Sequence, residues 1–139
     1  MALLYCYYGD DFTGSTDVLE QLAMGGVASV LFLTLPTPAQ LARFAGSQAI
    51  GFAGDARSRS PEWMSNHLTH LFTSMRELAP AVVQYKVCST FDSAPHRGSI
   101  GRGMPSDCEG PSIASWYIGA CGSGDSAGGC CVWVAGGNV

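Results

Sequence analysis

Residues 3–14, with the sequence LLYCYYGDDFTG, carry the pattern that decides the fold. The first six of these residues are apolar or aromatic and are typical of a buried strand at about residues 3–8. A polar turn bounded by glycines follows, and apolar residues then recur at helical spacing from about Gly14 to Met24. Gly25-Gly26 supplies a C-terminal stop for this helix. The segment therefore predicts a strand, a polar turn and a helix in succession.

The same alternation of apolar runs and amphipathic stretches continues to about Arg102. Further strands are expected at residues 27–33, 49–53 and 81–87, and helices at about 37–44 and 60–78. Both helices are expected to begin with a hydroxyl N-cap followed by proline, Thr37-Pro38 and Ser60-Pro61. This order predicts an α/β fold with an open, mainly parallel sheet and flanking helices, a Rossmann-like arrangement of three layers.

Length and composition limit the classes of function. A chain of 139 residues with 47% hydrophobic and 13% charged residues suits one domain with a buried core. The net charge of −4, without a basic stripe, argues against a nucleic-acid partner. Apolar runs fall far short of the roughly 20 residues that span a bilayer, and the N-terminus lacks the features of a signal peptide. We therefore expect a cytoplasmic protein without a membrane partner.

The last part of the chain differs from the rest. Residues 105–139 contain eight glycines and four cysteines, no lysine or arginine, and no sustained apolar period. We divide the chain into a domain at residues 1–104 and an irregular Gly- and Cys-rich tail at 105–139, disordered or translated out of frame.

Unusual polar residues follow three of the expected strands. Asp10 and Asp11 come after the first strand, Arg57 lies in the loop after the third, and Lys86 is near the end of the fourth. In an open parallel sheet, ligands bind beyond the carboxyl ends of the strands. We therefore expect these side chains to share one edge of the sheet.

Each of these residues also has an ordinary structural interpretation. Asp11 or Thr13 would cap the following helix, with the neighbouring aspartate in solvent. Arg57 would be a surface charge, or would leave the role of anion clamp to Arg59. Lys86 would pair with one of the aspartates, because an unpaired cation at the end of an apolar strand is costly.

A hydroxyl-rich cluster follows the fourth strand, formed by Ser89, Thr90, Asp92 and Ser93. Together with the cations and the paired carboxylates, it predicts a pocket for a small hydroxylated acid. No metal site is expected, since His67 and His70 have no third ligand and the tail cysteines form no CxxC pair. The loop at residues 9–14 also lacks the lysine of a phosphate-binding Walker loop.

Four blocks of sequence carry a family resemblance: residues 9–17 (GDDFTGSTD), Arg57-Ser58, residues 85–93 (YKVCSTFDS) and residues 98–102 (GSIGR). Over about residues 3–102 the chain resembles the N-terminal, sugar-binding domain of the four-carbon acid sugar kinase family. That resemblance implies an ATP-dependent kinase acting on a hydroxyl of threonate, erythronate or 3-oxo-tetronate-like acids.

The resemblance also implies roles for individual residues. Asp10 and Asp11 would be catalytic and face substrate hydroxyls, one of them as the base that accepts a proton from the attacking hydroxyl. Arg57 would hold the substrate carboxylate. The other substrate contacts implied are Ser58, Lys86, Ser89, Thr90, Asp92 and Ser99.

Members of that family hold ATP in a second domain, which is not expected within 139 residues. ATP and Mg are therefore expected for the full-length family and not bound to this chain, which would be inactive by itself. The alternatives are a stand-alone sugar-acid-binding module, partnered by a separately encoded ATP domain or by further copies of itself, and, ranked last, an α/β phosphatase. The family pattern also stops at Gly103, and we expect a shift of reading frame there, testable by translating the coding DNA in its other two frames.

Overall fold

The computed structural model describes residues 2–88, 93–99 and 115–119. Five strands form one sheet in the order β2-β3-β1-β4-β5, and every neighbouring pair is parallel. The strands are β1 (Tyr5–Gly9), β2 (Ser29–Phe32), β3 (Ala49–Ala53), β4 (Val82–Lys86) and β5 (Ser115–Gly119). The predicted parallel α/β sheet is confirmed.

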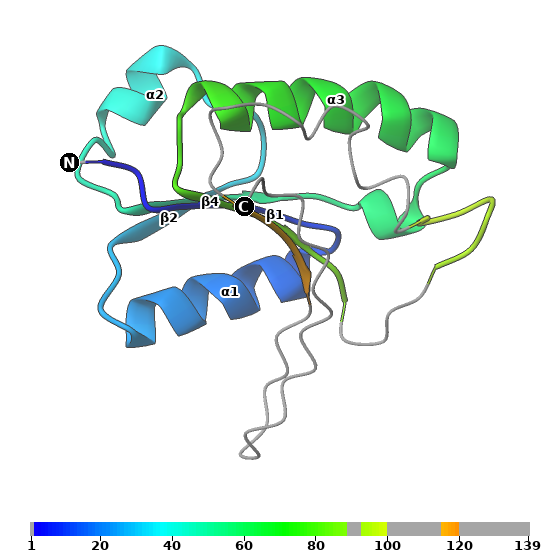
Figure 1. Cartoon of the computed structure of the whole chain (residues 1–139), viewed down its shortest axis with the longest axis horizontal. Helices are drawn as coiled ribbons and strands as arrows, with labels where there is room; N and C mark the ends of the chain where they lie inside the picture. Colours follow the sequence, from blue (N-terminus) through cyan, green and yellow to red (C-terminus); the bar gives the residue numbers. More distant parts are fainter. Residues whose placement is uncertain (1, 89–92, 100–114, 120–139) are drawn as a thin grey trace.

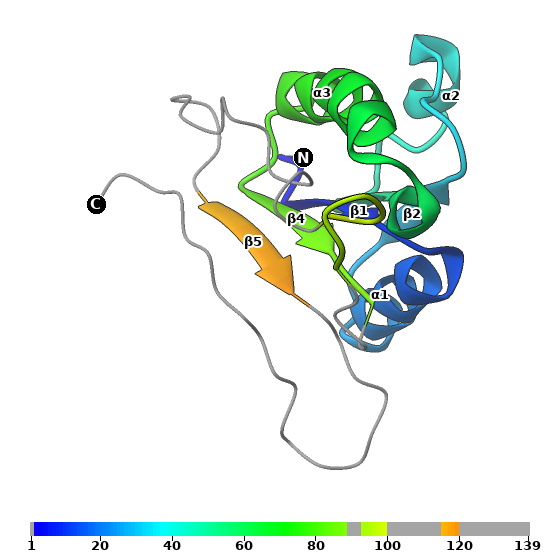
Figure 2. The same cartoon turned by 90° about the vertical axis from the view of Figure 1, so that its right-hand side faces the viewer.

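Helices cover both faces of the sheet, so the molecule has three layers (Figure 1). Helix α1 (Phe12–Met24) lies on one face, whereas α2 (Pro38–Ala42) and α3 (Pro61–Glu77) lie on the other. A short 3-10 turn, η1 (Ala56–Ser58), connects β3 to α3. Viewed from the side, β5 lies at the outer edge of the sheet, next to β4 (Figure 2).

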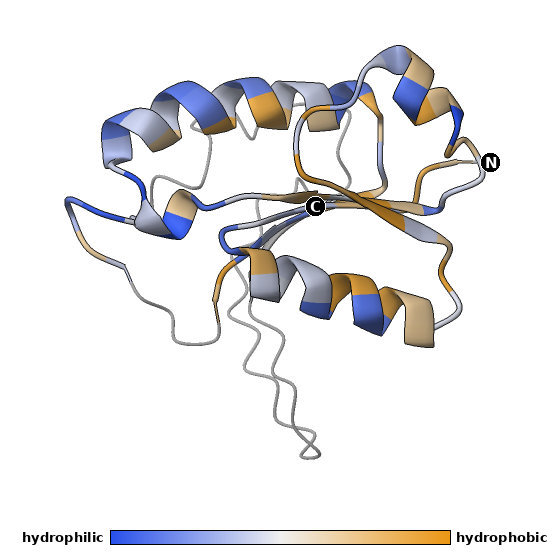
Figure 3. Ribbon diagram, turned by 180° about the vertical axis from the view of Figure 1, so that it is seen from behind, coloured by the Kyte–Doolittle hydropathy of each residue, from blue (hydrophilic) through white to orange (hydrophobic). Residues whose placement is uncertain are grey.

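The main core lies between α3 and the sheet. The strands of the middle layer are largely apolar (Figure 3). Alternate residues of β1, β3 and β4 point toward α3, which follows from the period of two in a strand. Phe72 of α3 packs against Tyr8 and Tyr85, with ring centroids 6.4 and 6.2 Å away. The buried residues of this core include Cys6, Tyr8, Ile50, Phe52, Met64, Leu68, Phe72, Met75, Val83 and Tyr85.

The face toward α1 is packed differently. Tyr7 is fully buried, and its hydroxyl donates a hydrogen bond of 3.0 Å to the backbone oxygen of Ser15. Gly51 on the neighbouring strand leaves room for the Tyr7 ring, since a Cβ there would overlap it. This close fit holds α1 against β1, and thereby sets where the first turn of α1 meets the end of the strand.

Local capping explains where the helices begin. Asp11 is the N-cap of α1 and its side chain accepts from the backbone N–H of Gly14, so α1 begins at Phe12 and not at about Gly14. Thr37 and Ser60 cap α2 and α3 as predicted, each before a proline. Gly25 and Gly26 end α1, with Gly26 at φ +76°.

The predicted irregular tail is wrong for one segment, because Ser115–Gly119 forms β5 and pairs in parallel with β4. This segment has the sequence SWYIG, whose aromatic and β-branched residues favour a strand.

Within the described part of the chain, no helix has the length and apolar character needed to cross a membrane.

Candidate functional site

The ends of three strands converge at one edge of the sheet. Gly9, the last residue of β1, is in register with Ala53 of β3 and Lys86 of β4. Backbone hydrogen bonds continue just beyond the strands, from Asp10 N to Lys86 O at 3.0 Å and from Arg57 N to Asp10 O at 3.1 Å. The sheet therefore brings together the polar clusters that follow β1, β3 and β4, as the sequence predicted from strand order.

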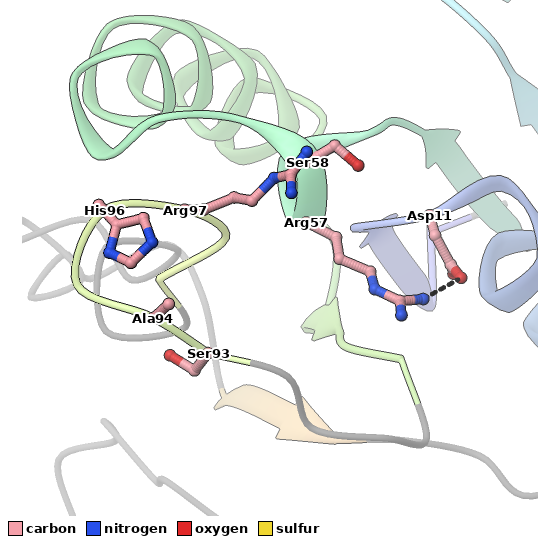
Figure 4. A pocket seen from close by; sticks show the side chains of 7 residues that line it. All are labelled: Asp11, Arg57, Ser58, Ser93, Ala94, His96 and Arg97. Carbon is pink, nitrogen blue, oxygen red and sulfur yellow. Dashed lines mark ion pairs between the residues drawn. The ribbon is translucent and has the colours of Figure 1, made fainter.

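A cavity of about 590 Å³ opens at this edge. Its described lining comprises Asp11, Arg57, Ser58, Ser93, Ala94, His96 and Arg97 (Figure 4). The walls come from three places: the N-cap of α1, the η1 turn, and the loop at residues 93–99. Six of these seven residues, all except Ala94, have polar or charged side chains, which suit a small polar ligand.

Asp11 makes two contacts at the N-terminus of α1. One carboxylate oxygen, Oδ1, accepts from the Gly14 N–H at 2.8 Å, and the other, Oδ2, lies 3.6 Å from Nη1 of Arg57. A carboxylate at a helix N-terminus is also stabilised by the helix dipole. Asp11 is thus held in place from two sides while it lines the cavity.

Asp10 lies behind Asp11 and is not among the described residues that line the cavity. Only 3% of its surface is exposed, and within the described part of the chain its Oδ1 atom has no hydrogen-bond partner. Burial, together with the negative charge of Asp11, raises the pKa of Asp10 to about 6, against the opposing effects of Lys86, a backbone hydrogen bond at Cys88 and Arg57. The interpretation that placed Asp10 in solvent is therefore wrong.

Lys86 is also buried, with 1% of its surface exposed. Its Nζ donates a hydrogen bond of 2.7 Å to the backbone oxygen of Val87. A Cβ on Gly14 would lie 2.9 Å from this nitrogen, so the glycine lets the amino group approach the first turn of α1. Lys86 supplies the positive charge beneath Asp10 that a buried carboxylate needs.

Arg57 projects from η1 toward Asp11 (Figure 4). Its Nη1 atom also lies 3.1 Å from Sγ of Cys88, at the end of β4. The side chain retains 36% exposure, so part of the guanidinium remains accessible from the cavity. Arg57 therefore links all three strand ends.

The structure groups only some of the predicted site residues. Asp11, Arg57 and Ser58 line one cavity, and Ser99 is half-buried nearby in sequence but is not part of the described lining. The predicted contacts Ser89, Thr90 and Asp92 lie outside the described residues.

Two lining residues, His96 and Arg97, were not predicted from the sequence. The available signal was the presence of two basic residues in the loop after β4, since such a loop ends at the same edge as the other clusters. His96 and Arg97 lie between residues 85–93 and residues 98–102, two of the blocks that carry the family resemblance, and belong to neither block.

The described residues contain no group of three His, Cys, Asp or Glu side chains placed to hold a metal ion. His67, which shares a helix with His70, stacks on the Trp63 ring with centroids 4.2 Å apart. Its environment on α3 is therefore aromatic.

The family model of the sugar-binding N-terminal domain matches residues 5–105 of this chain. The chain belongs to this family. The match spans the strands β1 to β4 and the described residues that line the cavity. The predicted resemblance to a sugar-binding N-terminal domain is thereby confirmed.

Curated relatives of this sugar-binding domain are kinases. Over 102 residues the chain is 52% identical to a 3-oxo-isoapionate kinase of Paraburkholderia graminis, covering 73% of this chain and 22% of the kinase. Over 101 residues it is 36% identical to a 3-oxo-tetronate kinase of Pseudomonas savastanoi pv. phaseolicola, covering 72% of this chain and 23% of that kinase. The chain thus spans less than a quarter of the length of these relatives.

One solved structure resembles the sugar-binding domain in fold. It is the crystal structure of a putative tRNA synthase from Salmonella typhimurium LT2, with a TM-score of 0.57 and 24% identity. The likeness covers 68% of this chain and 22% of that chain, and at this level of identity it shows the fold alone.

Proposed function

We propose that this chain is the substrate-binding portion of an ATP-dependent kinase that phosphorylates a hydroxyl of a four-carbon sugar acid. The observation that supports this most is the single cavity at the ends of β1, β3 and β4, where a carboxylate, two guanidinium groups and hydroxyl side chains meet. A sugar acid offers a carboxylate and several hydroxyls, which these groups complement. The two kinases described above match the chain over 102 and 101 residues.

The two aspartates have different parts in this proposal. Asp11 lines the cavity and is the candidate to accept a proton from the attacking hydroxyl of the sugar acid. Asp10 is buried behind Asp11, close to the charge of Lys86, and helps to fix the position of the neighbouring Asp11. Ser58 and Arg57 contribute polar contacts from η1, and Lys86, Ser89, Thr90, Asp92 and Ser99 complete the proposed set.

ATP and Mg would supply the phosphoryl group and neutralise its charge in a full-length kinase. The loop after β1 places Asp10 and Asp11 where a phosphate-binding loop offers glycine and lysine, and the described part holds no three-residue acidic cluster for a metal. We therefore propose that this chain binds the sugar acid and that nucleotide binding belongs to other parts of the longer relatives.

Calorimetric titration of the full chain with threonate and with erythronate tests the proposal. We expect saturable binding of at least one acid, and a rise in the thermal midpoint at saturating ligand, because a ligand that binds only the native state stabilises it. Asp11→Asn keeps an oxygen that can cap α1 but loses the second carboxylate oxygen, which is the proposed acceptor for a substrate hydroxyl. It should therefore weaken binding about 10-fold while changing the midpoint of the unliganded protein little. Glu20→Gln, a change on the exposed part of the same helix, is the matched control. A folded chain that binds neither acid would refute the proposal.

A further inference from the structure

The guanidinium of Arg57 is shared between the cavity and protein partners. Nη1 lies 3.6 Å from the Asp11 carboxylate and 3.1 Å from the Cys88 sulfur. The ion pair with Asp11 offsets part of its charge. A second positive group in the cavity would add to its hold on an acid.

Arg97 is that group. It is exposed in the loop at residues 93–99, lines the same cavity, and within the described part of the chain has no carboxylate partner. Figure 4 shows its guanidinium lying toward Ser58, away from the pair formed by Arg57 and Asp11. Among the described lining residues, two guanidinium groups face one carboxylate, so Arg97 leaves this part of the cavity with an excess of positive charge. A planar guanidinium beside a hydroxyl is well suited to a carboxylate.

The backbone holds Arg97 in place. Ala94 and Arg97 form a tight turn closed by two backbone hydrogen bonds of 3.2 and 3.3 Å. The next residue, Gly98, is buried at φ +57° and its N–H donates 2.8 Å to the oxygen of Arg59. A Cβ at this position would overlap the backbone oxygen of Arg57. Gly98 thus ties the turn that carries Arg97 directly onto η1, which carries Arg57 and Ser58.

We propose that Arg97 is the residue that recognises the carboxylate of the ligand, with Ser58 beside it, and that Gly98 sets its position, while Arg57 holds and orients Asp11. This assignment rests on the proposed function for the identity of the ligand. It places the two ends of the sugar acid: the carboxylate lies at the loop of residues 93–99, and the hydroxyls extend toward Asp11. Arg97 then determines the preference for an acid over a neutral polyol.

Calorimetry on the full chain with threonate and its neutral carboxamide, threonamide, tests this role. Wild type should bind threonate about 10-fold or more tightly than threonamide, because a charge-assisted hydrogen bond is lost in the amide. Arg97→Gln should bind both compounds alike, with threonamide affinity within about 2-fold of wild type, and Arg97→Lys should restore part of the difference. Arg43→Gln, at an exposed arginine outside the cavity, should behave as wild type. Gly98→Ala should lower the preference for the acid without removing the Arg97 side chain.

Other outcomes separate this role from the proposed function. Full discrimination between acid and amide in Arg97→Gln would overturn the role of Arg97 while leaving sugar-acid binding in place. If wild type binds neither compound, acetate and inorganic phosphate serve as probes, followed by the backbone amide shifts of residues 93–99. Shifts with acetate that Arg97→Gln abolishes would keep a carboxylate site and reject only the sugar-acid ligand. Shifts with phosphate alone, or with neither probe, would overturn the assignment.

Discussion

Asp10 and Asp11 are adjacent in sequence yet meet opposite environments. Asp11 caps a helix, pairs with Arg57 and faces the cavity, so its negative charge is stabilised from two sides. Asp10 is buried, and within the described residues one of its oxygens has no hydrogen-bond partner. A buried carboxylate without full pairing destabilises the native state when it is ionised. At neutral pH the ionised Asp10 therefore lowers the free energy of unfolding. This loss of stability accompanies the placement of Lys86 and two aspartates together at one edge of the sheet.

The pKa of Asp10 predicts a specific pH dependence of stability. Its folded-state pKa of about 6 lies above the ordinary value of 3.8. Between these pH values the native protein retains a proton that the unfolded chain has lost, so the contribution of Asp10 to the free energy of unfolding falls as the pH rises and is lowest above about pH 6. Asp11, Lys86 and Arg57 are the charged groups that face it, with Tyr8 and Tyr85 nearby.

Asp10→Asn has no proton to lose in this window. We expect its thermal midpoint to rise relative to wild type between pH 4 and pH 7, by at least about 3 °C. Circular dichroism melts at half-unit pH steps measure the difference, and Glu20→Gln serves as the exposed carboxylate control. A midpoint difference that stays constant across the range would show that Asp10 keeps its ordinary pKa in the folded protein.

At the scale of elements, the end of α3 stores backbone strain. Ala79 follows the C-cap residue Leu78 and adopts φ +50°, the left-handed region that costs a residue with a Cβ about 1–2 kcal/mol. Its N–H donates to Arg76 O at 2.9 Å, and the next residue, Pro80, is buried. The turn between α3 and β4 thus has an alanine at a position whose backbone conformation favours glycine.

Ala79→Gly should therefore stabilise the protein. Relief of the strain is offset in part by the greater freedom of glycine in the unfolded chain, about 0.4–1 kcal/mol, and we expect a net gain of about 0.5 kcal/mol in the free energy of unfolding. Urea denaturation gives this value directly. Ala81→Gly, two residues later and without a positive φ, is the control and should lower stability. A loss of stability in Ala79→Gly would mean that Ala79 makes contacts that outweigh its strain.

The elements were largely predictable because their signals are local. The bounds of β3 agree with the predicted residues 49–53, where a short apolar run ends at glycine, and the prolines after Thr37 and Ser60 marked two helix starts. Strand order also predicted that the clusters after β1, β3 and β4 would meet. The burial of Asp10 and the position of Arg97 were not predictable, since both depend on contacts between segments far apart in the chain. Gly98, which anchors Arg97, contacts Arg57 and Arg59 only in the folded sheet.

At the scale of the whole molecule, we expect binding without turnover. The full chain, threonate and Mg-ATP should give no ADP above background in a coupled assay, because the chain spans less than a quarter of the kinases that it matches. The 3-oxo-isoapionate kinase of Paraburkholderia graminis, assayed with the substrate in its name, is the positive control. Formation of ADP that depends on the sugar acid and is lost in Asp11→Asn would show that the chain is a complete kinase.

The position of β1 has a consequence for how the protein is made. The first strand in the chain is the centre of the sheet, and its partners begin at Ala49 and Val82. At a synthesis rate of about 5–20 residues per second, the ribosome adds Ala49, the start of the first partner strand, roughly 2–9 s after Tyr5. It adds Val82, the start of the second partner strand, later still. During that time the ribosome carries an apolar strand, YCYYG, with both edges unpaired. Slower translation of the first fifty codons would lengthen this exposure, so the yield of soluble protein should depend on the speed of synthesis as well as on the stability of the finished fold.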